Sequence, residues 1–190
     1  MDRSWLRVAE KLVYHDPVSY LIELRRFEVK LAMSDTAPKL KALRTNGLRV
    51  AREQRQAAIF CHGMSERLGH KIYFASDEGQ DYDFIASSLI EGARYYVPVQ
   101  LKEVVSVEEN PHSSIEAVIA SLTKYTESKG LTVAIYLNQG VLFNPSALQI
   151  PELNIGELWV FGNTTHDSSR WAVWGDFTKE QSIGTQFFYP

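Results

Sequence analysis

Three side chains near the middle of the chain have the types and the spacing that metal-dependent phosphodiester hydrolysis requires. Asp83 stands directly before one apolar stretch, and Gln100 and Lys102 stand two residues apart in the next. Residues two apart on a β-strand point to one face, so Gln100 and Lys102 should project together. If the two stretches pair as a hairpin, Asp83 comes close to both. Two oxygen ligands and an ammonium group would then meet, and oxygen ligands hold the hard divalent cations that promote attack on phosphate.

The segment 81–105 must form that hairpin. We expect one strand to begin directly after Asp83 and a longer strand to cover residues 95–105, with a turn between them. Pro98 lies inside the second strand, where it cannot donate a ladder hydrogen bond, so it predicts a bulge or a local edge. Asp81 is close enough in sequence to be an alternative ligand. We prefer Asp83 because the apolar residues follow it directly.

Helices are expected before the hairpin. Asp16 followed by Pro17 is typical of a helix start, and the apolar pattern continues that helix to about residue 33. The periodicity predicts further helices over residues 38–46 and 48–68, the second ending before Gly69. The inward stripe of the helix over 48–68 should be Ala57, Phe60, Cys61 and Met64.

The rest of the chain is strand-like, with one more helix. Residues 71–76 should form a strand. Ser113, with an acid three residues later, predicts a capping box for a helix that ends at Gly130. The apolar run 131–137 predicts a buried strand, reached by a right-handed crossover. Three further strands are expected, over residues 158–161, 170–177 and 186–189.

Length and composition favour one domain, and the order of helical and strand-like segments favours the α/β class. The chain has 190 residues, of which 45% are hydrophobic, enough for one substantial core. We expect a mixed β-sheet flanked by helices, with a helical extension over 1–45, a core over 48–138 and strands over 150–190. A single cysteine excludes an internal disulfide, and no apolar run reaches the ~20 residues of a membrane span. The first residues lack a signal-peptide core, so a cytoplasmic location is expected.

Charge is unevenly distributed along the chain. The formal net charge is −3, yet residues 1–55 hold 12 Lys and Arg against 7 Asp and Glu. A helical face with this excess could bind phosphates, although a solvated charged helix is an equally good interpretation. The basic residues concerned are Lys39, Lys41, Arg44, Arg49, Arg52 and Arg55.

The predicted order of elements resembles a known family. Helix, strand, strand beginning with an acid, strand with Gln-x-Lys, helix, strand is similar to the PD-(D/E)xK nuclease superfamily, which has the restriction-endonuclease-like fold. The resemblance covers about residues 48–138, with Gln100 where the family often has an acid. It implies a nuclease that acts on DNA and uses Mg²⁺, or Mn²⁺ as an alternative.

The resemblance also implies roles for individual residues. Asp83 would be the first metal ligand, Gln100 the second and Lys102 the catalytic lysine, with the main-chain carbonyl of Leu101 as a further ligand. Members often add an acid from the helix before the sheet. Glu53 fits that position, and Glu66 is the competitor. The residues expected to contact DNA lie in the basic segment 39–55 and are Arg44, Arg49 and Arg52.

Other functions remain open at this stage. The same fold without turnover could serve as a nucleic-acid-binding or protein-interaction module, and residues 1–45 could form a homodimer. Cys61 followed by a histidine could be a nucleophile, but a cysteine on an apolar helical stripe is more often a core residue. The tryptophans could stack bases, but they more often fill a core or an oligomer contact. They are Trp159, Trp171 and Trp174.

Overall fold

The computed structural model describes residues 4–33, 49–77, 82–105, 110–138, 143–179 and 183–190. The helices are α1 (Ser4–Ala9), α2 (Pro17–Ala32), α4 (Arg49–Leu68) and α5 (Ile115–Ser121), with the 3-10 turns η2 (Leu122–Lys124) and η3 (Pro145–Ala147). The strands are β1 (Ile72–Ser76), β2 (Phe84–Ile90), β3 (Ala93–Val104), β4 (Ser128–Leu137), β5 (Ile155–Asn163), β6 (Arg170–Gly175) and β7 (Ile183–Phe188). The helix predicted over 38–46 lies outside these residues.

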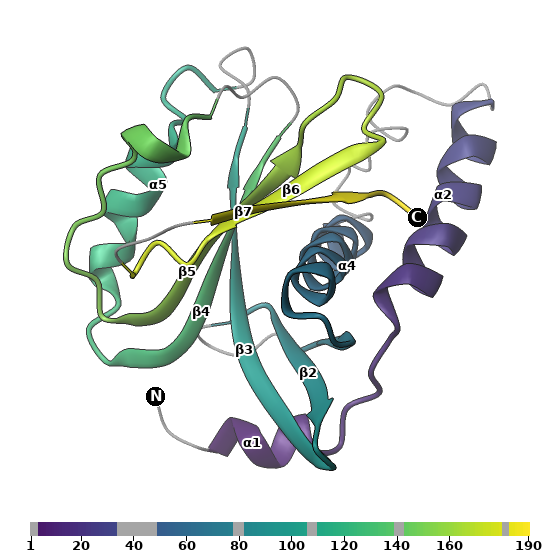
Figure 1. Cartoon of the computed structure of the whole chain (residues 1–190), viewed down its shortest axis with the longest axis horizontal. Helices are drawn as coiled ribbons and strands as arrows, with labels where there is room; N and C mark the ends of the chain where they lie inside the picture. The colour runs from purple at the N-terminus through teal and green to yellow at the C-terminus, as the bar shows by residue number, and fades with distance from the viewer. Residues whose placement is uncertain (1–3, 34–48, 78–81, 106–109, 139–142, 180–182) are drawn as a thin grey trace.

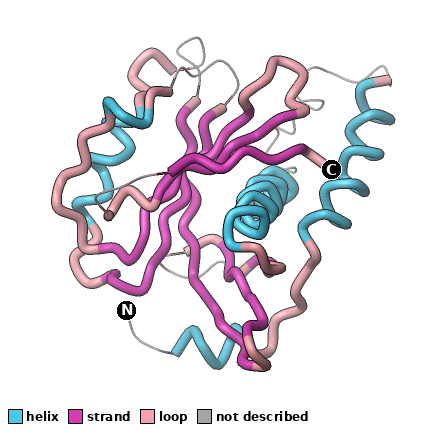
Figure 2. Tube along the Cα trace, viewed as in Figure 1, coloured by secondary structure: helices cyan, strands magenta, loops and turns pink. Residues whose placement is uncertain are grey.

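The seven strands form one mixed sheet in sequence order. The β3–β4 and β4–β5 pairs are parallel, and the other four pairs are antiparallel. Figures 1 and 2 show α4, with α2 outside it, on one side of the curled sheet and α5 on the other. The expected mixed sheet flanked by helices is therefore confirmed. The order α4, β1, β2, β3, α5, β4 is the order predicted for residues 48–138.

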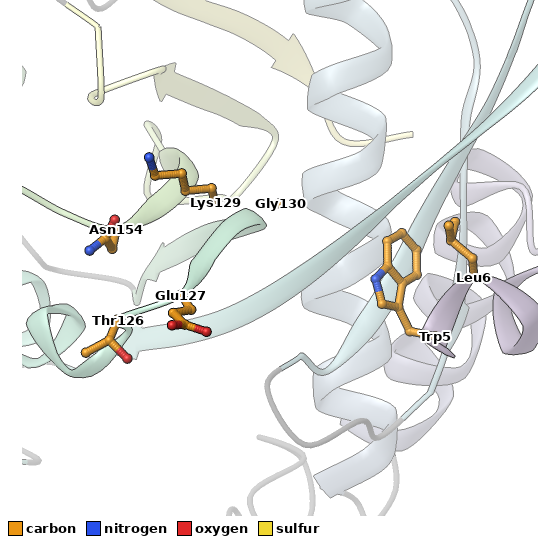
Figure 3. A pocket seen from close by; sticks show the side chains of 7 residues that line it. All are labelled: Trp5, Leu6, Thr126, Glu127, Lys129, Gly130 and Asn154. Atoms are coloured by element: carbon orange, nitrogen blue, oxygen red, sulfur yellow. The ribbon is translucent and has the colours of Figure 1, made fainter. Parts of the chain in front are cut away.

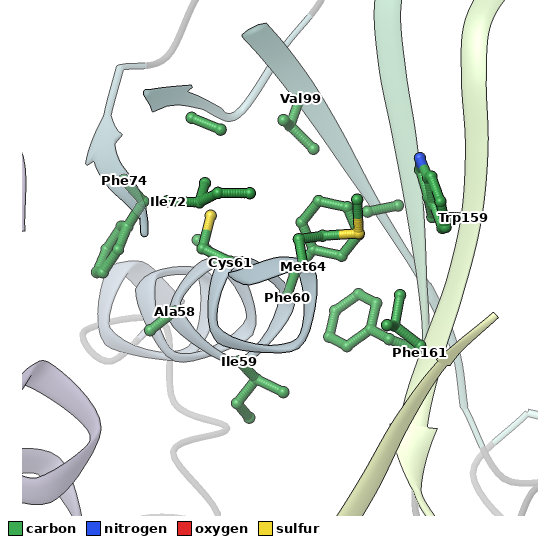
Figure 4. Packing of buried hydrophobic residues seen from close by; sticks show 14 of the residues in the cluster. Ala58, Ile59, Phe60, Cys61, Met64, Ile72, Phe74, Val99, Trp159 and Phe161 are labelled. Atoms are coloured by element: carbon green, nitrogen blue, oxygen red, sulfur yellow. The ribbon is translucent and has the colours of Figure 1, made fainter. Parts of the chain in front are cut away.

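Helix α4 supplies the apolar face that one side of the sheet covers. Its predicted stripe points at strand residues such as Phe74, Val99 and Phe161 (Figure 4). Gly69 has a φ of 71°, the left-handed conformation that ends many helices, and its N–H donates to the Ser65 carbonyl at 2.9 Å. Burial raises the pKa of the Cys61 thiol. The core interpretation of this cysteine is confirmed, because a buried thiol is a poor source of thiolate.

The N-terminal region packs on this core. Asp16 caps α2, since its Oδ1 accepts a hydrogen bond from Ser19 N at 2.9 Å, and the helix begins at Pro17 as predicted. Leu21 is fully buried in the cluster around α4. His15 pairs with Phe74 of β1 through two backbone hydrogen bonds of 2.8 and 3.2 Å. In the described part of the chain, no helix is long and apolar enough to cross a membrane.

Strand β3 changes its partner at Val99. Before this residue it pairs with β2, in a register that is continuous through Pro98, and from Val99 onward it pairs with β4. The hairpin turn has Glu91 and Gly92 at φ values of 50° and 83°, as a type I′ turn requires. Of the two predictions for Pro98, the local edge is correct and the bulge is wrong: the proline directly precedes the ladder with β4.

Two predictions for the crossover helix are wrong. Ser114, not Ser113, is the cap: its backbone is extended and its hydroxyl accepts from Ala117 N at 3.1 Å. The Ser113 hydroxyl instead accepts from Val105 N at 3.1 Å, at the end of β3. The helix ends long before Gly130, which belongs to β4, because Ser128 already pairs with β5 and this pairing overrides the helical pattern. The three later strands exist, with somewhat different bounds.

Candidate functional site

Asp83 directly precedes β2, at the point where the described ladder between β2 and β3 ends. Its backbone N–H donates to the Val99 carbonyl at 2.9 Å. One residue further along β3 there is no β2 partner within the described ladder. There the Asp83 carboxylate replaces a strand partner as the hydrogen-bond acceptor, since its Oδ2 accepts a hydrogen bond from Leu101 N at 2.7 Å. The local strand pairing therefore fixes the carboxylate against β3.

Gln100 binds to the same carboxylate. Its Nε2 donates to Asp83 Oδ2, and also contacts the Leu101 carbonyl oxygen at 3.2 Å. The side-chain amide therefore lies between two oxygens that the sequence nominated as metal ligands. Gln100 and Asp83 are brought together, as the hairpin geometry predicted.

Lys102 projects from the same face of β3 as Gln100. Leu101 between them packs in the cluster around α4, whereas Val104 packs in the cluster that contains Ile115 of α5, so the even-numbered residues face α5. Burial lowers the pKa of Lys102, Lys124 lowers it further, and Asp83 opposes the shift. Lys102 is thus half-buried, near Asp83, with a second ammonium group in its surroundings.

The acid of helix α4 that lies near this site is Glu53. Its negative charge contributes to the raised pKa of Asp83, and Glu53 forms a 2.7 Å ion pair with Arg49. Glu66 lies thirteen residues further along the helix, about 20 Å away at 1.5 Å per residue, and is exposed. The structure therefore brings Glu53 and not Glu66 towards Asp83.

The Asp83 carboxyl has a pKa above its ordinary value. Burial is the main cause, and the nearby Glu53 carboxylate adds to it. The hydrogen bond from Leu101 N and the charges of Lys102 and Arg49 act in the opposite direction. A positive charge that approached Asp83 would therefore be favoured, because it would relieve the cost of holding this carboxylate ionised.

A polar network behind the site was missed by sequence reasoning. Gln56 of α4 donates to Glu103 Oε2 at 3.4 Å, and Asn138 donates to Glu103 Oε1 at 3.3 Å. These contacts join α4, β3 and the end of β4 next to Lys102. A signal was present in the sequence: Gln56 stands beside the apolar stripe of its helix, and a buried amide requires partners.

The predicted basic residues are divided between several positions. Arg49 is exposed, forms an ion pair with Glu53 and contributes a charge that acts to lower the pKa of Asp83. Arg52 is half-buried, and its Nε has no hydrogen-bond partner among the described residues. The remaining nominated positions Lys39, Lys41 and Arg44, together with Asp81, lie outside the described residues.

Arg55 contacts other elements of the fold and is not placed near Asp83 by any of these contacts. Its Nε lies 3.1 Å from Glu28 Oε1 of α2, and its guanidinium stands over the rings of Trp171 and Tyr189, at 5.7 Å from each centroid. Such contacts hold α2, α4 and the end of the chain together. Arg55 is therefore a packing residue and not part of a solvated basic helical face.

The tryptophans belong to the packed interior. Trp159 and Trp171 are buried, and Trp171 stacks on Tyr136 with ring centroids 6.1 Å apart. Trp174 is half-buried and packs edge-on against Phe143 at 5.1 Å. The core interpretation of these residues is confirmed for Trp159 and Trp171, which are too buried to stack on a base.

Asp83 is not among the lining residues of two surface pockets. One, of about 440 Å³, separates Trp5 and Leu6 of α1 from the polar residues around the start of β4, among them Glu127 and Lys129 (Figure 3). The other, of about 260 Å³, is mainly apolar and lies between α4 and the β2–β3 hairpin, with Val97 in its lining. Neither is lined by the candidate site residues.

Comparison with known proteins identifies no family for this chain. No protein-family model, curated protein or solved structure matches the chain. Among the described residues, no group of three or more His, Cys, Asp and Glu side chains is arranged to hold a metal ion. The oxygen donors around Asp83 are instead an amide, a main-chain carbonyl and the more distant carboxylate of Glu53.

Proposed function

We propose that this chain is a divalent-cation-dependent nuclease that hydrolyses DNA phosphodiester bonds, with a site similar to that of the PD-(D/E)xK superfamily. The observation that carries the proposal is the convergence on Asp83. Gln100 and Leu101 both donate to its Oδ2, and Lys102 lies close enough to affect it electrostatically. The element order from α4 to β4 supports the same family.

The oxygen atoms available as ligands at this position suit a hard cation such as Mg²⁺ or Mn²⁺. Asp83 offers a carboxylate whose pKa is raised mainly by burial and also by the Glu53 carboxylate, and the Leu101 carbonyl faces the same point. Glu53 can add a second carboxylate once it is released from Arg49. When bound, the cation supplies charge neutralisation on phosphate oxygen and a more acidic water.

Lys102 is the residue we assign to the attacking water and the phosphate. In hydrolysis a water oxygen bonds to phosphorus, the bond to one ester oxygen breaks, and that leaving oxygen takes up a proton. The lowered pKa of Lys102 means that more of its amine is neutral at a given pH than in an ordinary lysine. It can therefore exchange a proton with water, and in its charged form it donates to a phosphate oxygen.

Arg49 links this site to nucleic acid. It is an exposed cation of α4 whose charge acts on Asp83, and its partner Glu53 belongs to the proposed cation site. A DNA phosphate can replace Glu53 as the partner of Arg49 when Glu53 turns towards a cation. The Arg49–Glu53 ion pair would then be replaced by a contact between Arg49 and a phosphate and one between Glu53 and the cation. This exchange would couple binding of DNA to binding of the cation.

Cleavage of plasmid and single-stranded DNA, with Mg²⁺, Mn²⁺ or EDTA, tests the proposal. We expect cleavage by the parent with either cation, none in EDTA, and none by Asp83→Asn. Asp167→Asn is the matched control, because Asp167 is an exposed aspartate of the β5–β6 loop. Cleavage by Asp83→Asn at the rate of the parent would reject the site.

A second function is favoured by the contacts of Gln100. Its amide already satisfies Asp83 without a cation, as expected of a nuclease-fold protein that binds nucleic acid or a protein partner and does not turn over. This function predicts salt-dependent DNA binding and no cleavage with any cation. Changing Arg44, Arg49 and Arg52 together to alanine should then lower the slope of log affinity against log salt by roughly 0.9 for each lost contact with duplex DNA. Equal binding by the parent and the triple variant would reject this basic surface.

A further inference from the structure

We infer that Gln100 competes with the cation at Asp83 and is not one of its ligands. The inference rests on the proposed function, because it concerns the same site. It reverses the role that the family resemblance gives to this residue. The side-chain amide would act as a built-in occupant of the cation position.

The contacts of the amide carry this assignment. Gln100 Nε2 donates to Asp83 Oδ2 and to the Leu101 carbonyl, the two other groups of this strand pair that the family resemblance assigns as cation ligands. A group that bears partial positive charge therefore stands where a cation would contact both oxygens. A ligand would have to present its oxygen Oε1 there instead.

The Gln100 amide can turn either its oxygen or its nitrogen towards Asp83, and without a cation only the nitrogen can form a hydrogen bond there. With Oε1 turned inward, the oxygens of Gln100, Asp83 and Leu101 would face one another, and the backbone donor that reaches them from the described part of β3, Leu101 N, already binds Asp83 Oδ2. With Nε2 turned inward, one charge-assisted hydrogen bond holds the amide to Asp83. The cation-free protein therefore favours the inward Nε2, and a cation must displace it.

The position of the site in the sheet strengthens the competition. Asp83 is half-buried against β3 beyond the end of the described β2 ladder, and its carboxylate there accepts hydrogen bonds from Leu101 N and Gln100 Nε2. Hydrogen bonds to ionised groups contribute more than neutral ones, and this contribution is lost when the amide leaves. Gln100 should consequently lower the affinity of the site for divalent cations.

Calorimetric titration with Mn²⁺ separates a competitor from a ligand. If Gln100 competes, Gln100→Ala should bind Mn²⁺ roughly tenfold more tightly than the parent, since the cation no longer displaces a charge-assisted hydrogen bond. Gln54→Ala is the matched control, because the Gln54 amide bonds Tyr20 and Ser76 and not the Asp83 carboxylate, and the affinity of this variant should equal that of the parent.

The other outcomes are distinguishable. Weaker Mn²⁺ binding by Gln100→Ala than by the parent would overturn the inference and make Gln100 a ligand, leaving the nuclease proposal intact. Absence of binding by the parent, by Gln100→Ala and by Gln100→Glu would overturn both proposals, because no cation site would exist.

A measurement on the cation-free protein gives an independent readout. In EDTA, the two Gln100 side-chain N–H signals, identified by their loss in Gln100→Ala, should exchange slowly with water. Added Mg²⁺ should accelerate that exchange in the parent and leave the Gln54 side chain unchanged. Rapid exchange of the Gln100 amide in EDTA would overturn the inference, whatever the cation affinities are.

Discussion

The two halves of β3 differ in partner, exposure and chemistry. The first half, residues 93–98, pairs with β2, and most of its side chains are exposed. The second half, residues 99–104, pairs with β4 and holds both core residues and the candidate site. The same strand thus serves as a hairpin arm and as the centre of the sheet.

The change of partner at Val99 explains why the candidate site lies in the second half. The described β2 ladder ends at Val99, and beyond it Asp83 accepts a hydrogen bond from Leu101 N on that side of β3. An acid at the end of one strand becomes adjacent to side chains on the next because that pairing stops. A strand with ladders on both sides would leave no backbone donor for a carboxylate to bind.

The largest expected difference between the halves is in activity. Lys102→Ala should reduce divalent-dependent DNA cleavage at least a hundredfold, since proton transfer and phosphate contact are lost, while circular dichroism remains that of the parent. Arg94→Ala is the control in the first half, where this exposed arginine lies over the ring of Tyr14. It should cleave like the parent. Equal activity of Lys102→Ala and Arg94→Ala would remove the catalytic distinction between the halves.

Stability should differ as well, and two valines give a matched test. Val99 is 1% exposed and Val97 is 38% exposed, two residues apart on one strand. Val99→Ala should lower the free energy of unfolding by about 2 kcal/mol, from lost burial and a residual cavity, and Val97→Ala by less than about 1 kcal/mol. Urea denaturation of both variants measures this. Similar losses would show that the first half is packed as well as the second.

A smaller effect should appear in the pH dependence of unfolding. The Asp83 pKa is raised, mainly by burial, so the stability linked to its protonation is full below its ordinary pKa of 3.8 and is lost as pH rises through the folded value. Asp83→Asn should abolish this part of the decline. Asp167 should show the opposite sign, because hydrogen bonds from Thr165 and Ser169 lower its pKa to about 2. Denaturation curves from pH 3 to 7 for each variant, subtracted from the parent, check both signs.

The hairpin and the proximity of Asp83 to Gln100 could be predicted because local signals determine them. Alternation marked the strands, the turn residues placed Asp83 opposite Gln100, and a proline marked the limit of pairing. Helix α4 followed from its apolar stripe and from Gly69. These features depend on neighbours in sequence, where periodicity and turn preferences are informative.

The rest depended on partners far away in sequence. Periodicity reports which face is buried, but it does not report which strand pairs with which, so the early start of β4 opposite Ile155 was missed. The network of Gln56, Glu103 and Asn138 joins three elements, and no local pattern connects those positions. The amide orientation of Gln100 also follows from the three-dimensional arrangement of acceptors and not from its place in Gln-x-Lys.

The smallest expected effect concerns Pro98, which marks the boundary between the halves. Because the proline precedes the β4 ladder, its missing N–H should cost the sheet little, and Pro98→Ala should lose only the ~0.4–1 kcal/mol that proline gains by restricting the unfolded chain. Pro145→Ala, at the start of η3, is the control for that entropic effect and should lose a similar amount. Thermal unfolding compares the two, at roughly 2–4 °C for each kcal/mol in a chain of this size. A loss of more than about 2 kcal/mol for Pro98→Ala alone would mean that the ring itself holds the halves of β3 in their different pairings.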